Sequence, residues 1–245
     1  GCVVFTSGAT EAINLAMTGS GASRFAVSAI EHAAVLDTAQ ALDPAVQILP
    51  VDGEGLVDAQ VEWAKGTGLV AVMQVNNEIG TVQPVEALAE RAHEAGALFL
   101  CDAVQGVGKL APPGNADMIA ISAHKLYGPK GIGALWVRDG LELKPLIHGG
   151  GQEQGLRSGT LSPALCAGFG AAAALAKERM DADAAMVEGL WQQARDKLSR
   201  WTLNGSATRR WHGNLNVRLE GLDVARLMSD LRSLAFSAGS ACASG

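Results

Sequence analysis

Lys125 and Asp102 have the clearest chemical potential in this chain, because each is expected where an apolar strand ends. Lys125 follows the apolar run 118–121, and a buried lysine amine tends to lose its charge and become a nucleophile toward carbonyl groups. Asp102 follows the apolar run 97–101, and an aspartate there can keep a pyridine nitrogen protonated. The two residues together predict a site for pyridoxal phosphate (PLP), with a desolvated Lys125 as the group that captures it.

Strand-like and helix-like segments alternate along the chain, which predicts an α/β fold with a mostly parallel sheet flanked by helices. The expected strands are residues 2–5, 25–30, 46–51, 69–75, 97–101, 117–121 and 133–137. Helices are expected at 10–17, 33–42 and 85–95, followed by an Ala-rich helical region from 163 to about 201 that breaks into two near Asp181. A strand at 214–219, a helix at 223–232 and a strand at 234–237 complete the pattern. This order predicts a large domain over residues 1–180 and a partial smaller α+β domain over residues 181–245.

Polar segments follow most of the expected strands, and ligands of parallel sheets bind beyond the carboxyl ends of the strands. The segments are 6–10, 31–32, 76–78, 102–105, 122–125 and the loop that holds Cys242. We expect them to converge on one edge of the sheet and to form a single site.

Each polar residue also has a plainer interpretation. The segment 6–11 suits a phosphate at a helix N-terminus, but it also suits a threonine cap supported by Glu11. His32 could stack on an aromatic cofactor or shuttle protons, or it could simply be solvated. Asn77 and Gln105 could bind a phenolic oxygen or make ordinary loop hydrogen bonds. Cys242 lies among small residues in the sequence. It could be an accessible, reactive thiol, or it could be an incidental thiol without a role.

Composition excludes several classes of protein. The 245 residues are 48% hydrophobic with a net charge of −6, and they contain no basic cluster, which argues against nucleic acid as a direct partner. Four scattered cysteines predict neither a metal site nor a disulfide scaffold and favour a cytoplasmic location. No segment is long and apolar enough to predict a membrane span. Because the chain opens on a strand-like segment without an initiator Met, we expect it to be a piece of a longer protein.

Several motifs resemble one protein family. They are Phe5-Thr-Ser-Gly-Ala-Thr-Glu11, Glu31-His-Ala-Ala-Val-Leu36, Val75-Asn-Asn-Glu-Ile-Gly80, Asp102-Ala-Val-Gln105, Ser122-Ala-His-Lys-Leu-Tyr-Gly-Pro-Lys-Gly-Ile-Gly133, Arg157-Ser-Gly-Thr160 and Ser237-Ala-Gly-Ser-Ala-Cys242. Over residues 1–245 the chain resembles the cysteine desulfurases, which are class V aminotransferases of the fold-type-I PLP enzymes. The cysteine in the last motif separates desulfurases from the aminotransferases.

The resemblance implies PLP-dependent conversion of L-cysteine to L-alanine. It implies that Lys125 is the Schiff-base lysine, that Asp102 holds the pyridine nitrogen and that Cys242 receives the sulfur as a persulfide. The sulfur would pass to an acceptor or scaffold protein for iron–sulfur cluster or other sulfur-compound biosynthesis.

The resemblance also assigns the remaining site residues. His32 would stack on the cofactor ring and take part in catalysis, with Asn77 and Gln105 near the ring hydroxyl. The phosphate would be held by Ala9, Thr10, Ser122 and His124. Thr160 would reach the phosphate of the neighbouring subunit's cofactor, which implies a homodimer.

The chain departs from the family pattern in three ways. Ala123 replaces the usual glycine, and Ile13 stands where asparagine is common. The family carries further residues before position 1 and after position 245, including the arginine that binds the substrate carboxylate. We therefore expect truncation at both ends, and the activity of this chain alone stays open. Two alternatives remain: another class V PLP enzyme, such as a selenocysteine lyase or an aminotransferase, and a non-catalytic fragment with the PLP fold.

Overall fold

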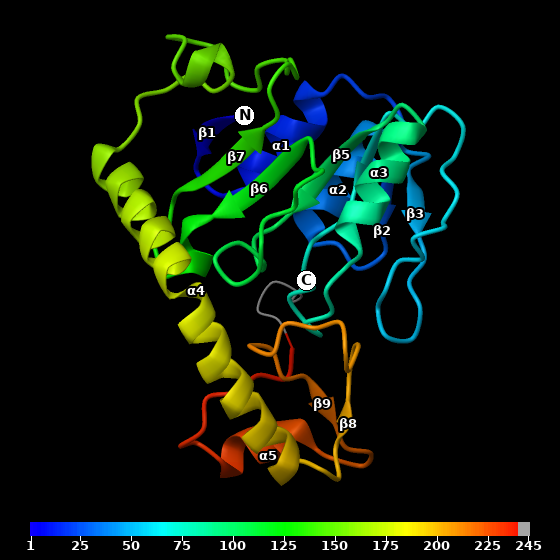
Figure 1. The fold of residues 1–245 in the computed structure, drawn as a ribbon, viewed down its shortest axis with the longest axis vertical. Helices are drawn as coiled ribbons and strands as arrows, with labels where there is room; N and C mark the ends of the chain where they lie inside the picture. Colours follow the sequence, from blue (N-terminus) through cyan, green and yellow to red (C-terminus); the bar gives the residue numbers. More distant parts are fainter. Residues whose placement is uncertain (240–245) are drawn as a thin grey trace.

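Seven strands form one sheet in the order β1-β7-β6-β5-β4-β2-β3 (Figure 1). The computed structural model describes residues 1–239. The strands are β1 (Cys2–Thr6), β2 (Phe25–Ser28), β3 (Gln47–Leu49), β4 (Leu69–Ala71), β5 (Leu98–Asp102), β6 (Met118–Ser122) and β7 (Gly133–Val137). All seven predicted strands of this region are present, most of them shortened or shifted at their ends.

All pairings in the sheet are parallel except those of β7, which runs antiparallel to both β1 and β6. Six strands therefore share one direction, and their carboxyl ends lie at one edge, which we call the carboxyl edge. The reversed strand β7 begins at this same edge, where Gly133 pairs with both Thr6 and Ser122. The predicted mostly parallel α/β fold is confirmed.

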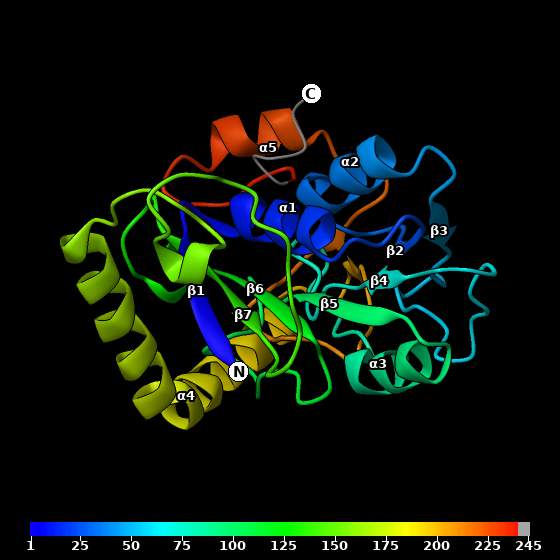
Figure 2. The ribbon, with the colours of Figure 1, turned by 90° about the horizontal axis from the view of Figure 1, so that it is seen from above.

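Helices cover both faces of the sheet. Figure 2 shows α1 (Ala9–Gly19) and α2 (Ala33–Leu42) over one face and α3 (Val85–Glu94) over the other. In α3, the buried residues Val85, Leu88, Ala89 and Ala92 recur at steps of three and four, so they form one apolar stripe. Two buried clusters, one on each face of the sheet, form the core that fixes the carboxyl edge.

The helix α4 (Pro163–Lys197) runs from the sheet to a second lobe, residues 198–239 (Figure 1). This lobe contains β8 (Thr202–Leu203), β9 (Val217–Arg218) and α5 (Val224–Asp230). Although α4 is long, none of the helices in residues 1–239 has the apolar stretch that crossing a membrane requires.

Two predictions for this region are wrong. The helix does not break near Asp181, because residues 171–188 contain no Gly or Pro and an Arg179–Asp183 ion pair of 3.0 Å spans the position. The predicted domain boundary at residue 180 therefore falls inside α4. The predicted strand at 234–237 is absent, since no strand in the described part of the chain pairs with it. The pair β8–β9 is short, and the sequence analysis missed β8.

The sheet and α1 approach each other most closely at Gly133. A Cβ atom at this position would lie 2.6 Å from the Gly8 carbonyl carbon and 2.6 Å from the Ile121 oxygen, both of them backbone atoms. We expect Gly133→Ala to lower the melting temperature by roughly 3–9 °C, because the backbone must move to make room. Gly189→Ala is the matched control, since a Cβ in this part of α4 would touch nothing. Calorimetry should show an unchanged or higher melting temperature for the control. A Gly133→Ala protein as stable as the wild type would contradict the expected clash.

Candidate functional site

The first turn of α1 lies at the carboxyl edge and contains Ala9 and Thr10. The helix begins after Gly8, and no side chain of residues 1–239 caps it. The threonine cap considered from the sequence is therefore not present; instead the Ser7 N–H donates to the Glu11 carboxylate at 2.8 Å. An uncapped helix N-terminus among small residues, with a positive dipole end, suits an anion such as a phosphate.

His32 and Asp102 come from neighbouring parts of the same edge. His32 precedes α2, and its Nδ1 accepts a hydrogen bond from the Ala34 N–H at 3.0 Å, so the neutral ring carries its proton on Nε2. Asp102 ends β5 and accepts from the Val104 N–H at 3.0 Å. Burial raises the pKa of the Asp102 carboxyl, while the Val104 bond and the nearby His32 ring act against this rise. An acid in this place can stay ionised when a cationic partner reaches it.

An open cavity of about 430 Å³ lies between residues 30–33, 36–37 and 76–79. His32 and Asn77 both line it, so the structure brings these two candidate residues together. The Asn77 amide donates to the Glu78 carboxylate at 2.9 Å. Gln105, from the turn after β5, instead accepts from the Lys109 amine at 3.2 Å.

Ser122, His124 and Lys125 lie at the end of β6 and in the 3-10 turn Ala123–Leu126 that follows. The Ser122 hydroxyl and His124 Nδ1 are 2.8 Å apart. The prediction that Lys125 is desolvated is wrong, because its side chain is exposed in the turn. The partly buried amine nearby is Lys109, whose pKa is lowered to about 8 by burial and by the charge of Lys125. Lys109 was not among the residues predicted from the sequence, because residues 105–109 form turns and no local pattern there indicates burial.

Glu31 is a second group that sequence reasoning did not assign. It is buried beside His32, and its Oε1 accepts from the Ser28 hydroxyl at 2.5 Å and from the Met73 N–H at 2.8 Å. Its Oε2 is buried without a hydrogen-bond partner among residues 1–239. Burial, with a smaller contribution from the charge of Asp102, raises the pKa of Glu31 to about 8 against the lowering effect of the Ser28 and Met73 hydrogen bonds. A pKa of about 8 favours the protonated, neutral form of Glu31 at pH 7.

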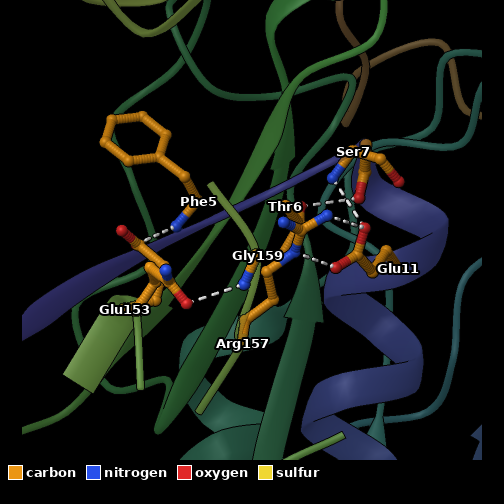
Figure 3. Close-up of polar contacts among 9 residues, drawn as sticks. Phe5, Thr6, Ser7, Glu11, Glu153, Arg157 and Gly159 are labelled. Atoms are coloured by element: carbon orange, nitrogen blue, oxygen red, sulfur yellow. Dashed lines mark hydrogen bonds and ion pairs between the residues drawn. The ribbon is translucent and has the colours of Figure 1, made fainter. Parts of the chain in front are cut away.

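The segment that carries Thr160 is tied to α1 (Figure 3). The Arg157 Nε donates to the Glu11 carboxylate at 2.7 Å, and the Glu153 carboxylate accepts from the Phe5 N–H at 2.6 Å. Burial alone would raise the pKa of Glu11, but the bonds from Arg157 and Ser7 hold it below its ordinary value. Thr160 itself is exposed three residues beyond Arg157.

Cys242 lies outside the described residues. The other three cysteines, Cys2, Cys101 and Cys166, are free thiols. Cys101 is fully buried, and burial raises the pKa of its thiol well above its ordinary value, as suits an inert core residue.

Known proteins resemble this chain in sequence. The aminotransferase class-V family pattern matches residues 2–245. A mitochondrial cysteine desulfurase of Arabidopsis thaliana is 41% identical over 99% of this chain and 58% of its own length. A cysteine desulfurase IscS of Shewanella denitrificans is 42% identical over 99% of this chain and 65% of its own length. The chain thus spans less than two thirds of these curated relatives.

Solved structures agree with these relatives. DndA from Streptomyces lividans superposes with a TM-score of 0.86 at 33% identity, covering 94% of this chain and 71% of DndA. A structure of SspA in complex with cysteine gives a TM-score of 0.82 at 36% identity, covering 98% of this chain and 72% of SspA. The sequence pattern, the sheet order and these similarities agree, and the chain belongs to the aminotransferase class-V family as a relative of the cysteine desulfurases.

Proposed function

We propose that this chain carries the catalytic machinery of a PLP-dependent cysteine desulfurase. The reaction would convert L-cysteine to L-alanine and place the sulfur on Cys242. The observation that carries the proposal is the gathering of His32, Asp102 and Lys125 with the uncapped start of α1 at one edge of the sheet. The curated relatives bear the name cysteine desulfurase, and one similar solved structure contains cysteine.

The residues present fit PLP. The close approach of Gly133 to Gly8 brings the start of α1 beside Ser122, so that helix N–H groups and a hydroxyl can bind the phosphate together. The buried Asp102 has the chemistry that a protonated ring nitrogen requires, and the exposed Lys125 amine can reach a carbonyl group. Ala9, Thr10 and His124 would complete the phosphate site.

When bound, PLP supplies a ring that accepts the electrons released at the substrate carbon. Asp102 would hold the proton on the ring nitrogen, and a protonated Glu31 would place no second negative charge beside it. The His32 ring would pack against the cofactor ring, with Asn77 and Gln105 near the ring hydroxyl. Lys125 would take the proton from the substrate Cα. The Cys242 thiolate would attack the substrate sulfur, so that an S–S bond forms as the substrate Cβ–S bond breaks. The electrons of the broken bond stay with the carbon skeleton, which leaves as alanine after protonation, and the sulfur stays on Cys242 as a persulfide.

We further propose a homodimer in which Thr160 binds the phosphate of the partner's cofactor. Two observations support this: the Arg157–Glu11 pair fixes the segment on α1, and Thr160 itself is exposed, where a partner's cofactor can reach it. The persulfide would pass to a sulfur-acceptor or iron–sulfur scaffold protein. The free described cysteines are consistent with a reducing compartment such as the cytoplasm.

The decisive experiment replaces Cys242 in the full-length protein. We expect Cys242→Ser to bind PLP with its visible absorbance intact and to lose cysteine-dependent sulfide release by more than about 100-fold, since it removes the attacking nucleophile. Absorbance spectra and sulfide assays measure the two effects separately.

Cys166→Ser is the matched control, because Cys166 packs beside the cluster of the 3-10 turn and α4 and has no proposed role in sulfur transfer. It should release sulfide at the wild-type rate. Sulfide release that persists in Cys242→Ser would indicate a lyase or aminotransferase. PLP absorbance without any turnover in the wild-type protein would indicate a non-catalytic member of the fold.

A further inference from the structure

We propose that Arg210, Trp211, Asn214 and Asn216 of the second lobe form a latch that positions the Asn77 loop at the candidate site. The latch is defined by its hydrogen bonds to four successive carbonyl groups, those of residues 77–80. The expected effect of the latch on PLP binding rests on the proposed function, whereas the hydrogen bonds of the latch do not.

Two asparagines bind the first part of the loop. The Asn214 amide donates to the Asn77 oxygen at 3.2 Å and to the Glu78 oxygen at 3.0 Å. The Asn216 amide donates to the same Glu78 oxygen at 3.0 Å. The Asn214 Oδ1 is buried without a partner in the described part of the chain, so this side chain serves the loop as a donor.

Arg210 and Trp211 bind the second part. The Arg210 Nη2 donates to the Ile79 carbonyl oxygen at 3.0 Å, and the backbone N–H of Trp211 donates to the Gly80 carbonyl oxygen at 2.8 Å. Arg210 also donates to three carbonyl oxygens of its own lobe, those of Asn204, Ser206 and Asn214. One guanidinium group therefore joins the two lobes.

The burial of Arg210 is unusual for a cation. Only 7% of the residue is exposed, and within residues 1–239 no carboxylate lies at ion-pair distance from it. A buried charge without a counter-ion is costly unless hydrogen bonds satisfy it, and here backbone carbonyls accept from Nη1 and Nη2, while Nε is buried without a partner within residues 1–239. Trp191 adds a ring whose centroid is 5.7 Å from the Arg210 guanidinium carbon. The lobe thus holds a buried cation that already lacks one hydrogen bond, and displacement of the Asn77 loop would remove a further acceptor, the Ile79 oxygen.

The other side of the loop is fixed by Asn76. Its Oδ1 accepts from the N–H groups of Glu78 and Ile79 at 2.9 and 3.0 Å, and its amide donates to the Ile30 oxygen at 2.9 Å. The loop is therefore held between the segment that leads into His32 and the second lobe. Asn77 and His32 line the same cavity, so a shift of the loop changes the distance between them.

Gly80 shows how close the two lobes approach. It has a φ of +71°, which favours glycine, and a Cβ there would lie 2.8 Å from the Asn214 Cβ. The closing turn of the loop and the latch therefore pack in direct contact, without space for a side chain between them.

The test compares hydrogen exchange of the loop amides in the cofactor-free protein. In Asn214→Asp we expect the backbone amide hydrogens of residues 78 and 79 to exchange about tenfold faster than in the wild type. The reason is that a carboxylate oxygen replaces the Asn214 amide donor and faces the carbonyl oxygens of Asn77 and Glu78. Exchange in β5 should stay unchanged. Arg209→Ala is the matched control, since Arg209 is the exposed neighbour of Arg210 and contributes only its backbone to the contact with Val82.

A second measurement connects the latch to the site. PLP titration followed by visible absorbance should show about tenfold weaker cofactor binding in Asn214→Asp and wild-type binding in Arg209→Ala. Three results for Asn214→Asp would each overturn the proposal. The exchange rate at residues 78 and 79 could stay unchanged, or exchange could become faster by the same factor throughout the sheet. Exchange at residues 78 and 79 could also become faster while the affinity for PLP stays that of the wild type. If Asn214→Asp does not fold, Asn216→Ala removes a single donor to Glu78 and should show a smaller change of the same kind. A wild-type protein that binds no PLP would refute the proposed function, and hydrogen exchange would still decide whether the latch exists.

Discussion

Lys125→Ala is expected to abolish covalent attachment of PLP and to lower alanine formation from cysteine by roughly a thousandfold or more. The reason is that Lys125 would both capture the cofactor and move the substrate proton. Treatment with borohydride followed by peptide mass spectrometry should find the cofactor on Lys125 in the wild-type protein and on no residue in the variant.

The structure supplies a demanding control for this experiment. Lys109 is partly buried nearby, and its pKa of about 8 makes it an easily deprotonated amine and a competitor for the cofactor. Lys109→Met should still show the cofactor on Lys125. Labelling of Lys109 in the wild-type protein would reverse the assignment of the two lysines.

Glu31→Gln is expected to change how stability depends on pH. The pKa of Glu31 is about 8 in the folded protein against 4.5 for the ordinary group. Below pH 4.5 both states are protonated, and the full stabilising contribution is present. Between pH 4.5 and about 8 the unfolded chain ionises first, so the wild-type protein loses stability as pH rises, on the order of 5 kcal/mol in total. Glutamine cannot ionise, and it can still accept from Ser28 and Met73.

Urea titrations from pH 5 to pH 9 measure this effect. The free energy of unfolding of Glu31→Gln, relative to the wild type, should rise up to about pH 8 and then level off. Glu178→Gln, on the exposed surface of α4, makes the same chemical change and should follow the wild-type curve. Parallel pH profiles for Glu31→Gln and the wild type would show that Glu31 is ionised in the folded protein.

Local sequence patterns were sufficient to predict the sheet and its flanking helices. The predicted range 133–137 coincides with β7, and the predicted range 33–42 coincides with α2. These elements have clear apolar patterns and end at glycine or at a change of polarity. The predicted strand 234–237 failed because pairing depends on a neighbour, which an apolar segment alone does not reveal.

The site was less accessible to sequence reasoning because burial depends on distant parts of the chain. Lys125 follows an apolar strand, yet the 3-10 turn and the left-handed Tyr127 leave its side chain exposed. The charged residues Lys109 and Arg210 look like surface residues in the sequence, but packing covers Lys109 in part and buries Arg210. Glu31 was noted only as the neighbour of His32, since its protonation follows from contacts with Ser28 and Met73. The roles assigned by resemblance to Thr160 and Cys242 stay predictions.

The unbroken helix α4 also limits how the two lobes can move. At 1.5 Å per residue, its 35 residues form a rod of about 52 Å. A tilt of about 5° at its Pro163 end would displace the far end by roughly 4–5 Å, enough to separate any hydrogen bond there. A small change in the angle at which α4 leaves the sheet would therefore be magnified at the second lobe, and it would shift the latch residues relative to the Asn77 loop.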